Sequence, residues 1–277
     1  MSLTINTNIM SLDAQNNLDK SQSSLSQALQ RLSSGMRINS AKDDAAGFYT
    51  SQIMTGDING MNQAIRNAND GVSLAQTGGA AMSEISKDLQ RLNELAVQSS
   101  NGTVQDRTGL QSEADQLTQE ISQIVTNSKF AGVSLLNSSA AVTFQVGQDG
   151  KSSNQISVNG IDLTGLKSYS AGLTATGTVD ISSASAASAA ISDIQADIKS
   201  VAKDAATFGA IQNRFNAVIS NLTSASQSLT SARSRITDAN FASETAKLSR
   251  AKILQQAGVS MVAQANAQPQ VALTLLR

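Results

Sequence analysis

Apolar residues recur at spacings of three and four along two long stretches of the chain. One run spans residues 191–236 and the other spans 61–96, and each breaks the alternation once. Such spacing places the side chains on one face of an α-helix, and a single slip alters the winding of a coiled coil without ending it. The pattern therefore predicts two helices far longer than the mean globular helix of about 11–12 residues.

A shorter run over 110–124 and a stripe near each end of the chain show the same helical spacing. The end stripes comprise Leu18, Leu25, Leu29, Leu32 and Met36, and then Leu254, Ala257, Met261 and Ala265. Long helices cannot bury their stripes alone, so we expect the three central helices to pack as a bundle. Because unattached chain ends are usually disordered, we expect the two end helices to pair with each other or with neighbouring subunits.

The pattern changes between residues 140 and 185. Val142, Phe144 and Val146 alternate with polar residues, QDGK supplies a turn, and Asn159-Gly160 favours a tight hairpin. The Ser-, Ala- and Thr-rich stretch 168–190 is typical of a loop that leads back to a helix. The predicted fold is therefore mainly α, a long coiled-coil-like helical bundle with a small β-hairpin insertion and paired N- and C-terminal helices.

Composition supports long, thin helical packing. Only 3% of the 277 residues are aromatic and Trp is absent, whereas 40% are hydrophobic. A compact core would lack its usual large fillers. Pro269 is the single proline, so almost nothing interrupts a long helix.

Charge and hydropathy argue against two classes of partner. The net charge is −1 with no basic run, which provides no electrostatic footprint for nucleic acid. No stretch approaches the roughly 18–20 apolar residues of a membrane-spanning helix, and there is no basic amphipathic helix for a membrane surface. The N-terminus also lacks the charged start and apolar centre of a signal peptide, which taken alone predicts a cytoplasmic protein.

The chain contains neither His nor Cys. Catalytic triads of the Ser-His or Cys-His kind are therefore impossible, as are zinc sites built on imidazole or thiolate. A site built only on carboxylates stays open in principle. We expect no enzyme, no metal and no cofactor.

The stretch LSSGMRINSAKDDAAG, residues 32–47, concentrates charge in a chain otherwise rich in Ser, Ala, Asn and Gln. It carries Arg37, Lys42, Asp43 and Asp44 between two glycines. A carboxylate pair beside a lysine could serve catalysis, or it could form a joint between two helices that holds a partner chain.

Local capping explains most of this stretch. Ser40 and Asp43 have the spacing of a capping box, and Gly35 suits the end of a helix. We therefore predict a helix that stops near Gly35 and a new helix that starts near Ser40. Asp43 and Asp44 would then lie in its first turn, where the helix dipole favours negative charge. We prefer this interpretation to a catalytic one.

Several motifs in the same order resemble bacterial flagellin. They are residues 5–47, IRNANDGVSLAQT at 65–77, LQRLNELAVQSSNGT at 89–103, QNRFNAVISNL at 212–222, and 231–277 through the final Leu-Leu-Arg. The resemblance covers about residues 1–135 and 190–277. It departs after DDAAG, where FYTSQIMTGDINGMNQ follows in place of the more usual family sequence.

The resemblance implies a filament subunit in two parts. Residues 1–45 and 236–277 would form a core domain of terminal helices, in which Leu18, Leu25, Leu29, Leu32, Leu254, Met261 and Val262 would lie. Residues 46–235 would form a helical domain that includes the hairpin region 142–163, with no outer variable domain. Arg37, Lys42, Asp43 and Asp44 would serve a self-assembly joint.

The resemblance also implies location and partners. The family is exported without a cleaved signal peptide through the flagellar type III secretion channel, which would place the chain in the extracellular filament. Its partners would be further copies of itself, an export chaperone, and the filament cap and junction proteins. Toll-like receptor five of a host would contact Arg91, Leu95 and Glu113, and a plant receptor would recognise residues 30–51.

Two alternatives stay open, and a third is excluded. A hook–filament junction protein shares related terminal helices but does not polymerise alone. A soluble coiled-coil adaptor would show the same heptads without assembling at filament ends. The zinc-protease insertion of some family members needs an H-E-x-x-H helix, which a chain without His cannot supply.

Overall fold

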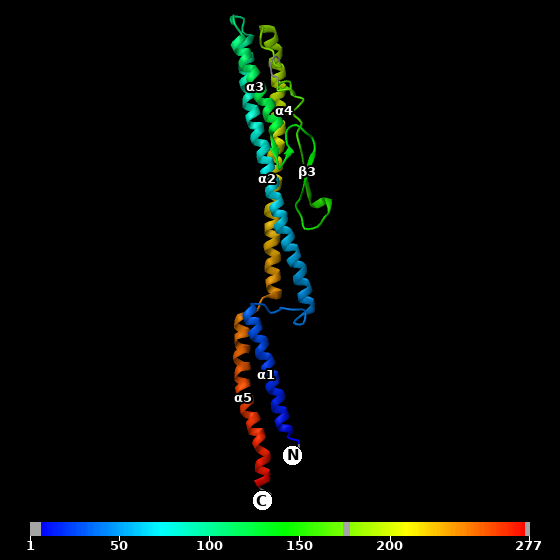
Figure 1. The fold of residues 1–277 in the computed structure, drawn as a ribbon, viewed down its shortest axis with the longest axis vertical. Helices are drawn as coiled ribbons and strands as arrows, with labels where there is room; N and C mark the ends of the chain where they lie inside the picture. Colours follow the sequence, from blue (N-terminus) through cyan, green and yellow to red (C-terminus); the bar gives the residue numbers. More distant parts are fainter. Residues whose placement is uncertain (1–6, 174–177, 275–277) are drawn as a thin grey trace. The chain divides into compact units, whose positions relative to one another are not determined.

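The computed structural model describes residues 7–173 and 178–274. In chain order, its elements are α1 (Ile9–Ser34), α2 (Ala45–Ser100), α3 (Thr108–Asn127), β1 (Lys129–Phe130), β2 (Val133–Ser134), β3 (Ala141–Gln145), a 3₁₀ turn (Ser152–Asn154), β4 (Gln155–Asn159), α4 (Ala184–Thr237) and α5 (Phe241–Thr274) (Figure 1). The predicted mainly α fold with a small hairpin insertion is confirmed. Parts of three predicted regions lie outside the described residues: 1–6 of the N-terminal core region, 174–177 in the loop and 275–277 at the C-terminal motif.

The chain divides into two compact units. Unit 1 comprises Met1–Ile58 with Gln227–Arg277, and unit 2 comprises Asn59–Ser226. Both boundaries fall inside helices, α2 and α4. The sequence had predicted boundaries at 45/46 and 235/236, which lie close to the start of α2 and the end of α4. That division stays a prediction.

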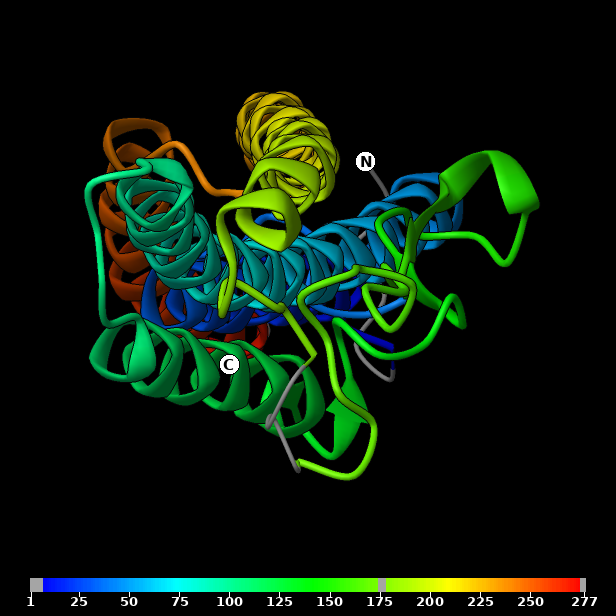
Figure 2. The same cartoon turned by 90° about the horizontal axis from the view of Figure 1, so that it is seen from above.

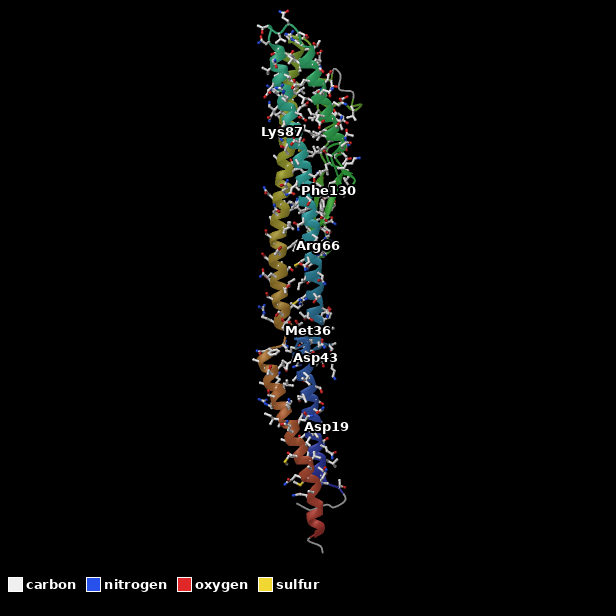
Figure 3. All side chains as sticks on the ribbon, turned by 60° about the vertical axis from the view of Figure 1, so that its left-hand side comes forward. Asp19, Met36, Asp43, Arg66, Lys87 and Phe130 are labelled. Atoms are coloured by element: carbon white, nitrogen blue, oxygen red, sulfur yellow. The ribbon has the colours of Figure 1, made fainter. Side chains whose placement is uncertain are left out.

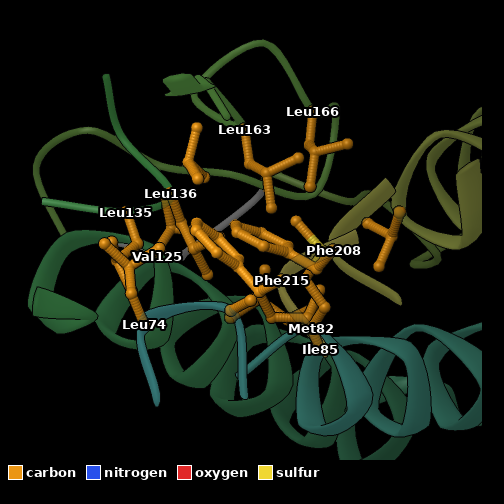
Figure 4. Packing of buried hydrophobic residues seen from close by; sticks show 14 of the residues in the cluster. Leu74, Met82, Ile85, Val125, Leu135, Leu136, Leu163, Leu166, Phe208 and Phe215 are labelled. Carbon is orange, nitrogen blue, oxygen red and sulfur yellow. The ribbon is translucent and has the colours of Figure 1, made fainter. Parts of the chain in front are cut away.

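The core of unit 2 joins the long helices to the segment that follows α3. Figure 4 shows Leu74, Met82 and Ile85 of α2, Val125 of α3, and Phe208 and Phe215 of α4 packed with Leu135, Leu136, Leu163 and Leu166. The Phe215 ring meets the Phe144 ring of β3 edge to face, with centroids 5.4 Å apart. This geometry is favoured between aromatic rings. The hairpin is thus part of the core of unit 2.

Strands β3 and β4 pair antiparallel, from Ala141 opposite Asn159 to Gln145 opposite Gln155. In the view from above (Figure 2), this hairpin projects to one side of the helices of unit 2. The expectation of a tight turn at Asn159-Gly160 is wrong, because Gly160 continues the pairing by donating its N–H to the Ala140 carbonyl. A side chain at Gly160 would overlap the backbone of Ser138, so this glycine permits a close approach of two backbone segments.

The short hairpin of β1 and β2 was not predicted from the sequence. Its turn residues, Ala131 and Gly132, both have positive φ angles of 49° and 84°. Two consecutive positive φ angles are typical of the turn that matches the twist of a two-residue hairpin. Strands of two residues are too short to show an alternating pattern, which explains why they were missed.

A buried carboxylate holds the segment after the hairpin against α4. Asp197 is 5% exposed, and its carboxylate accepts hydrogen bonds from the Lys167 and Ser168 amides and from the Ser168 hydroxyl, at 3.1, 2.9 and 2.8 Å. Nearby, the buried Ser122 hydroxyl accepts the Ser170 amide. These bonds supply partners for backbone groups that regular secondary structure leaves unpaired.

In unit 1, α1 and α5 pack side by side in opposite directions (Figure 1). Gly35 ends α1 in the left-handed conformation with φ of 69°, as predicted for a glycine at a helix end. The segments beside the two helices pair through their backbones: the Arg37 amide donates to the Thr237 carbonyl, and the Ala239 amide donates to the Gly35 carbonyl. We call residues 35–44 and 236–240 the joint.

The predicted helix start near Ser40 is wrong, because α2 begins at Ala45. Asp44, not Ser40, caps it by accepting the Gly47 amide at 2.9 Å. Asp43 instead closes a separate turn, in which its carboxylate accepts the Asn39 and Ser40 amides. Two adjacent aspartates thus serve two adjacent turns, and the capping-box spacing alone could not distinguish a turn from a helix start.

Candidate assembly interface

Helices α1 and α5 meet along faces of buried and half-buried side chains. On α1 these side chains include Ser11, Ala14, Leu18, Ser21, Leu25, Ala28 and Leu32, and on α5 they include Glu244, Leu248, Ala251, Gln255, Gly258, Val262 and Ala265. We call this contact the seam. Both faces alternate steps of three and four, as in a coiled coil. Half of these residues are Gly, Ala or Ser. Small residues let helix backbones approach closely, and a Cβ on Gly258 would lie 3.2 Å from the Leu18 side chain.

Polar groups bond across the seam at several levels. The Asn8 amide side chain donates to the Ala265 carbonyl, and the Ser11 hydroxyl donates to Asn266 Oδ1, both at 2.7 Å. The Gln255 side chain donates to Gln22 Oε1. Side-chain pairs of this kind require one particular alignment of the two helices.

Glu244 in the first turn of α5 is the charged member of the seam. It is only 4% exposed, and its carboxylate receives Lys247 Nζ at 2.7 Å and Arg31 Nη1 of α1 at 3.4 Å. The hydrogen bond from Lys247, aided by the Arg31 charge, lowers the pKa of Glu244 below its ordinary value despite the burial. A buried carboxylate needs a cationic partner. Because Arg31 lies on α1 and Glu244 on α5, their ion pair constrains where the two helices can meet.

Large apolar side chains are also exposed on the same two helices. Among the described residues, nine of fifteen exposed large hydrophobic side chains lie on α1 and α5: Ile9, Met10, Leu12, Leu29, Phe241, Ile253, Leu254, Val259 and Met261. We call these nine the exposed apolar set. Single exposed apolar residues are ordinary, but a concentration of this kind marks an interaction surface.

A groove of about 1100 Å³ also lies between α1 and α5. Its walls include Met10 and Met261 together with Asp13, Lys20 and Arg250. Mixed apolar and charged walls are suited to another protein segment.

The predicted terminal-core residues fall into two groups. Leu18, Leu25 and Leu32 are half-buried on the seam, as is Val262. Leu29 is 50% exposed, Leu254 51% and Met261 61%, so these three side chains point away from the centre of the seam. Of the small seam residues, Ala265 belonged to the predicted C-terminal stripe, whereas Ser11, Ala14, Ser21, Ala28, Ala251 and Gly258 were not predicted. Their signal in the sequence was the same alternation of three and four.

The joint contains all four charged residues singled out from the sequence. Arg37 Nη2 donates to the Ile236 carbonyl at 2.7 Å, and Lys42 is exposed. The amides of Asn39 and Ser40 hold the pKa of Asp43 below its ordinary value. Figure 3 labels Met36 and Asp43 in this segment. Each aspartate therefore has a structural task in a turn, which agrees with a joint and provides no support for catalysis.

The three residues expected to contact a host receptor differ in exposure. Arg91 donates through Nε to Glu113 of α3 at 2.8 Å and through Nη1 to Glu94 at 3.1 Å, and all three side chains are well exposed. Leu95 is 1% exposed. A protein that approached the Arg91–Glu113 pair could not touch Leu95 in this fold, so its burial gives the expected Leu95 contact no support.

Two negative findings apply to the part of the chain that the structure describes. Within it, no three or more Asp and Glu side chains gather in a way that could hold a metal ion. No helix within 7–173 or 178–274 has the length and hydropathy needed to cross a membrane.

Family models match both ends of the chain. The bacterial flagellin N-terminal helical region matches residues 5–141, and the bacterial flagellin C-terminal helical region matches residues 191–276. A flagellin of Halalkalibacterium halodurans is 40% identical over 278 residues, covering 99% of this chain and all of that protein. A flagellin of Serratia marcescens is 38% identical over the full length of both chains.

A solved structure shares the fold. The structure of a putative flagellar hook-associated protein from Vibrio parahaemolyticus matches with a TM-score of 0.60 at 12% identity, covering 71% of this chain and all of that one. The likeness is one of fold alone, whereas the identity to the two flagellins extends over whole chains. The chain therefore belongs to the bacterial flagellin family, whose members are structural subunits of the flagellar filament on the outside of the cell.

Proposed function

We propose that this chain polymerises into a helical flagellar filament through its α1–α5 pair, and that the filament serves motility. The exposed apolar set carries the proposal, because nine large apolar side chains on two helices leave much apolar surface in water. Contact with further copies would bury them. Head-to-tail contacts that do not close into a ring produce an open helical filament.

The route to the filament belongs to the same proposal. The chain would leave the cell through the flagellar type III secretion channel, with an export chaperone covering apolar surface beforehand. Cap and junction proteins would meet the filament at its two ends. The joint would transmit contacts between subunits, through Arg37, Lys42, Asp43 and Asp44.

Seeded polymerisation tests the proposal directly. Monomer would be mixed with sonicated filament fragments and examined by negative-stain electron microscopy, beside a version without residues 1–30 and 255–277. Long filaments from the full chain, and none from the truncated chain, are expected.

Point variants separate loss of the surface from loss of the fold. Ile253→Ser with Val259→Ser changes two members of the exposed apolar set, which are 65% and 57% exposed. The matched control is Val97→Ser, a 51% exposed apolar residue on α2. We expect the double variant to lose elongation at unchanged helical content, and the control to elongate normally. Equal elongation of both would contradict the proposed surface.

A hook–filament junction protein is the second candidate. Its support is the shared fold with the putative hook-associated protein. It would bind filament ends without elongating them. A full chain that stays monomeric, or adds only one layer to the seeds, would favour this candidate.

Recognition by Toll-like receptor five is a separate proposal. Its support is the exposed Arg91–Glu113 pair, which offers a charged patch on α2 and α3. Arg91→Ala should lower receptor activation in a reporter cell assay, whereas Lys87→Ala, one turn earlier on α2, should not. Equal activation by the wild type and the Arg91 variant would contradict it.

A further inference from the structure

The apolar part of the seam repeats every seven residues. Leu18, Leu25 and Leu32 follow one another at this spacing on α1, and Ala251, Gly258 and Ala265 do so on α5. In the observed register, Leu18 packs against Gly258. A leucine on one helix therefore faces a small residue on the other.

This repeat makes the apolar seam ambiguous. If α5 slid by seven residues in one direction, Leu18 would face Ala265, Leu25 would face Gly258 and Leu32 would face Ala251. Each leucine would then meet a small residue, as Leu18 meets Gly258 in the observed register. Packing by size alone therefore does not distinguish the observed register from one shifted by two helical turns.

The polar contacts of the seam follow a different period. Glu244, Gln255 and Asn266 of α5 are spaced eleven residues apart, and their partners on α1 are Arg31, Gln22 and Ser11. Eleven residues make three helical turns, so all three side chains lie on one face. A slide of seven residues would separate all three pairs at once.

Glu244 makes such a slide especially unfavourable. Slid in one direction, this carboxylate would face Leu25 instead of Arg31. Slid in the other direction, it would pass Ser34, the last residue of α1. A buried carboxylate that loses its cationic partner on the facing helix is strongly destabilised, more than a neutral pair that separates.

We infer that Glu244, Gln255 and Asn266 select the register in which α1 and α5 pair. The inference rests on the proposed function, because the register decides which members of the exposed apolar set share one surface for a neighbouring copy. These three are positioning residues: they act through the alignment of two helices. Polar residues that select register in an otherwise apolar helix pair are a known use of such groups.

The joint offers a rival explanation. Its backbone bonds, Gly35 to Ala239 and Arg37 to Thr237, also connect the two helices at one end of the seam. If these bonds alone set the register, removing the three polar side chains would leave it unchanged. The experiment must therefore measure register itself.

Engineered disulfides measure the register in monomers. The chain has no cysteine, so introduced pairs have no competitors. L18C with G258C reports the observed register, since a Cβ on residue 258 would lie 3.6 Å from the Leu18 Cβ, within the range of disulfides. L18C with A265C and L18C with A251C report slides of seven residues in the two directions.

Each cysteine pair is placed in two backgrounds. One carries E244A, Q255A and N266A, and the matched control carries S249A, K252A and Q256A on the exposed face of α5. Dilute monomer is oxidised with diamide, and the intramolecular product is quantified on non-reducing gels. Circular dichroism records the helical content of every variant.

In the wild type and the control background, we expect the 18–258 pair to cross-link about tenfold more than either slid pair. A factor of about ten is the change in equilibrium that the loss of one charge-assisted hydrogen bond produces. In the E244A/Q255A/N266A background, a slid pair should rise until the ratio is about threefold or less. An unchanged ratio would overturn the inference in favour of the joint. A parallel fall of all three cross-links would also overturn it, because it would show lost stability without a change of register.

The outcome does not depend on polymerisation. If the full chain failed to elongate seeds, the proposed function would fall while the cross-linking ratio still reported the register. If the chain elongated normally and the ratio never changed, only the inference would fall.

Discussion

The Phe215 ring of α4 occupies the space that a side chain at Gly71 of α2 would fill. A Cβ on Gly71 would lie 2.7 Å from the ring atoms Cε1 and Cε2, closer than real atoms approach. Seven residues further along α2, Gly78 stands in the same relation to the Phe208 ring, with Cζ at 2.7 Å. Two of the few aromatic residues thus fill spaces that glycines provide in the middle of a long helix.

Gly71→Ala should destabilise unit 2 although alanine favours helix. The added methyl must displace a buried ring, and overpacking of this kind costs about 1–3 kcal/mol. It outweighs the gain of about 0.8–1 kcal/mol in helix propensity. Thermal unfolding followed by circular dichroism measures the difference.

The matched control is Gly209→Ala on α4, where an added Cβ meets nothing within 4 Å. It should raise stability by about 0.5–1 kcal/mol, since only the propensity changes. A Gly71 variant as stable as the Gly209 variant would contradict the packing of Phe215 against α2.

Asp197→Ala should release the segment around Ser168. The substitution leaves two amides and a hydroxyl without their acceptor, and one unpaired buried group costs about 1–3 kcal/mol. We expect a loss of about 2–4 kcal/mol in the free energy of unfolding. Hydrogen exchange should also accelerate at the Lys167 and Ser168 amides. Asp193→Ala, an exposed carboxylate one turn earlier, should stay within about 0.5 kcal/mol of the wild type and exchange normally.

Asp88 should make unit 2 less stable at neutral pH. Burial, and then the neighbouring Glu120 and Glu84 charges, raise the pKa of Asp88 above its ordinary value of 3.8. Among the described residues, none donates a hydrogen bond to its buried Oδ2. The folded state therefore binds the proton of Asp88 more tightly than the unfolded state does. The resulting contribution of Asp88 to the free energy of unfolding is fully present below pH 3.8 and is lost as pH rises through the raised pKa.

Asp88→Asn should accordingly raise the melting temperature at pH 7, and the advantage should shrink toward pH 4. Asp70→Asn, an exposed carboxylate on the same helix, serves as control. An advantage of Asp88→Asn that is equal at both pH values would contradict the raised pKa.

Glu244 should make the α1–α5 pair sensitive to acid. Its pKa is lowered in the folded chain, so its contribution is present above the ordinary value of 4.5 and is lost as pH falls through the lowered value. Glu244→Gln should therefore lower the melting temperature of the pair at pH 6 more than at pH 3. A difference that grows toward pH 3 would refute the stated direction.

The charged residues of the joint should matter for assembly more than for helical content. Arg37→Gln removes the bond to the Ile236 carbonyl, and Asp43→Asn weakens the turn at Asn39 and Ser40. We expect both variants to elongate seeds more slowly while the circular dichroism of unit 2 is retained. Lys199→Gln, at an exposed residue of α4 outside the joint, is the comparison and should elongate normally. Normal elongation of the Arg37 and Asp43 variants would remove the joint from the assembly proposal.

The sequence by itself determined the long helices, because apolar residues at steps of three and four must face a partner over their whole length. It also determined the end of α1 at Gly35 and the strands around Phe144. These features depend on local backbone preference and on a period that many residues share. The family followed from motifs spread over both ends of the chain.

Only the tertiary structure decided how these elements meet. The start of α2 at Ala45 depended on Asp44 capping the helix, although the spacing of Ser40 and Asp43 had predicted a start near Ser40. Gly160 permits a close approach to Ser138, a role that a hairpin motif in sequence cannot distinguish from a turn. Half of the residues at the seam of α1 and α5 are Gly, Ala and Ser, which have weak hydropathy. The polar pairs of the seam join residues more than two hundred positions apart. Such pairs become visible only when the chain is folded, because nothing local in the sequence connects Arg31 with Glu244.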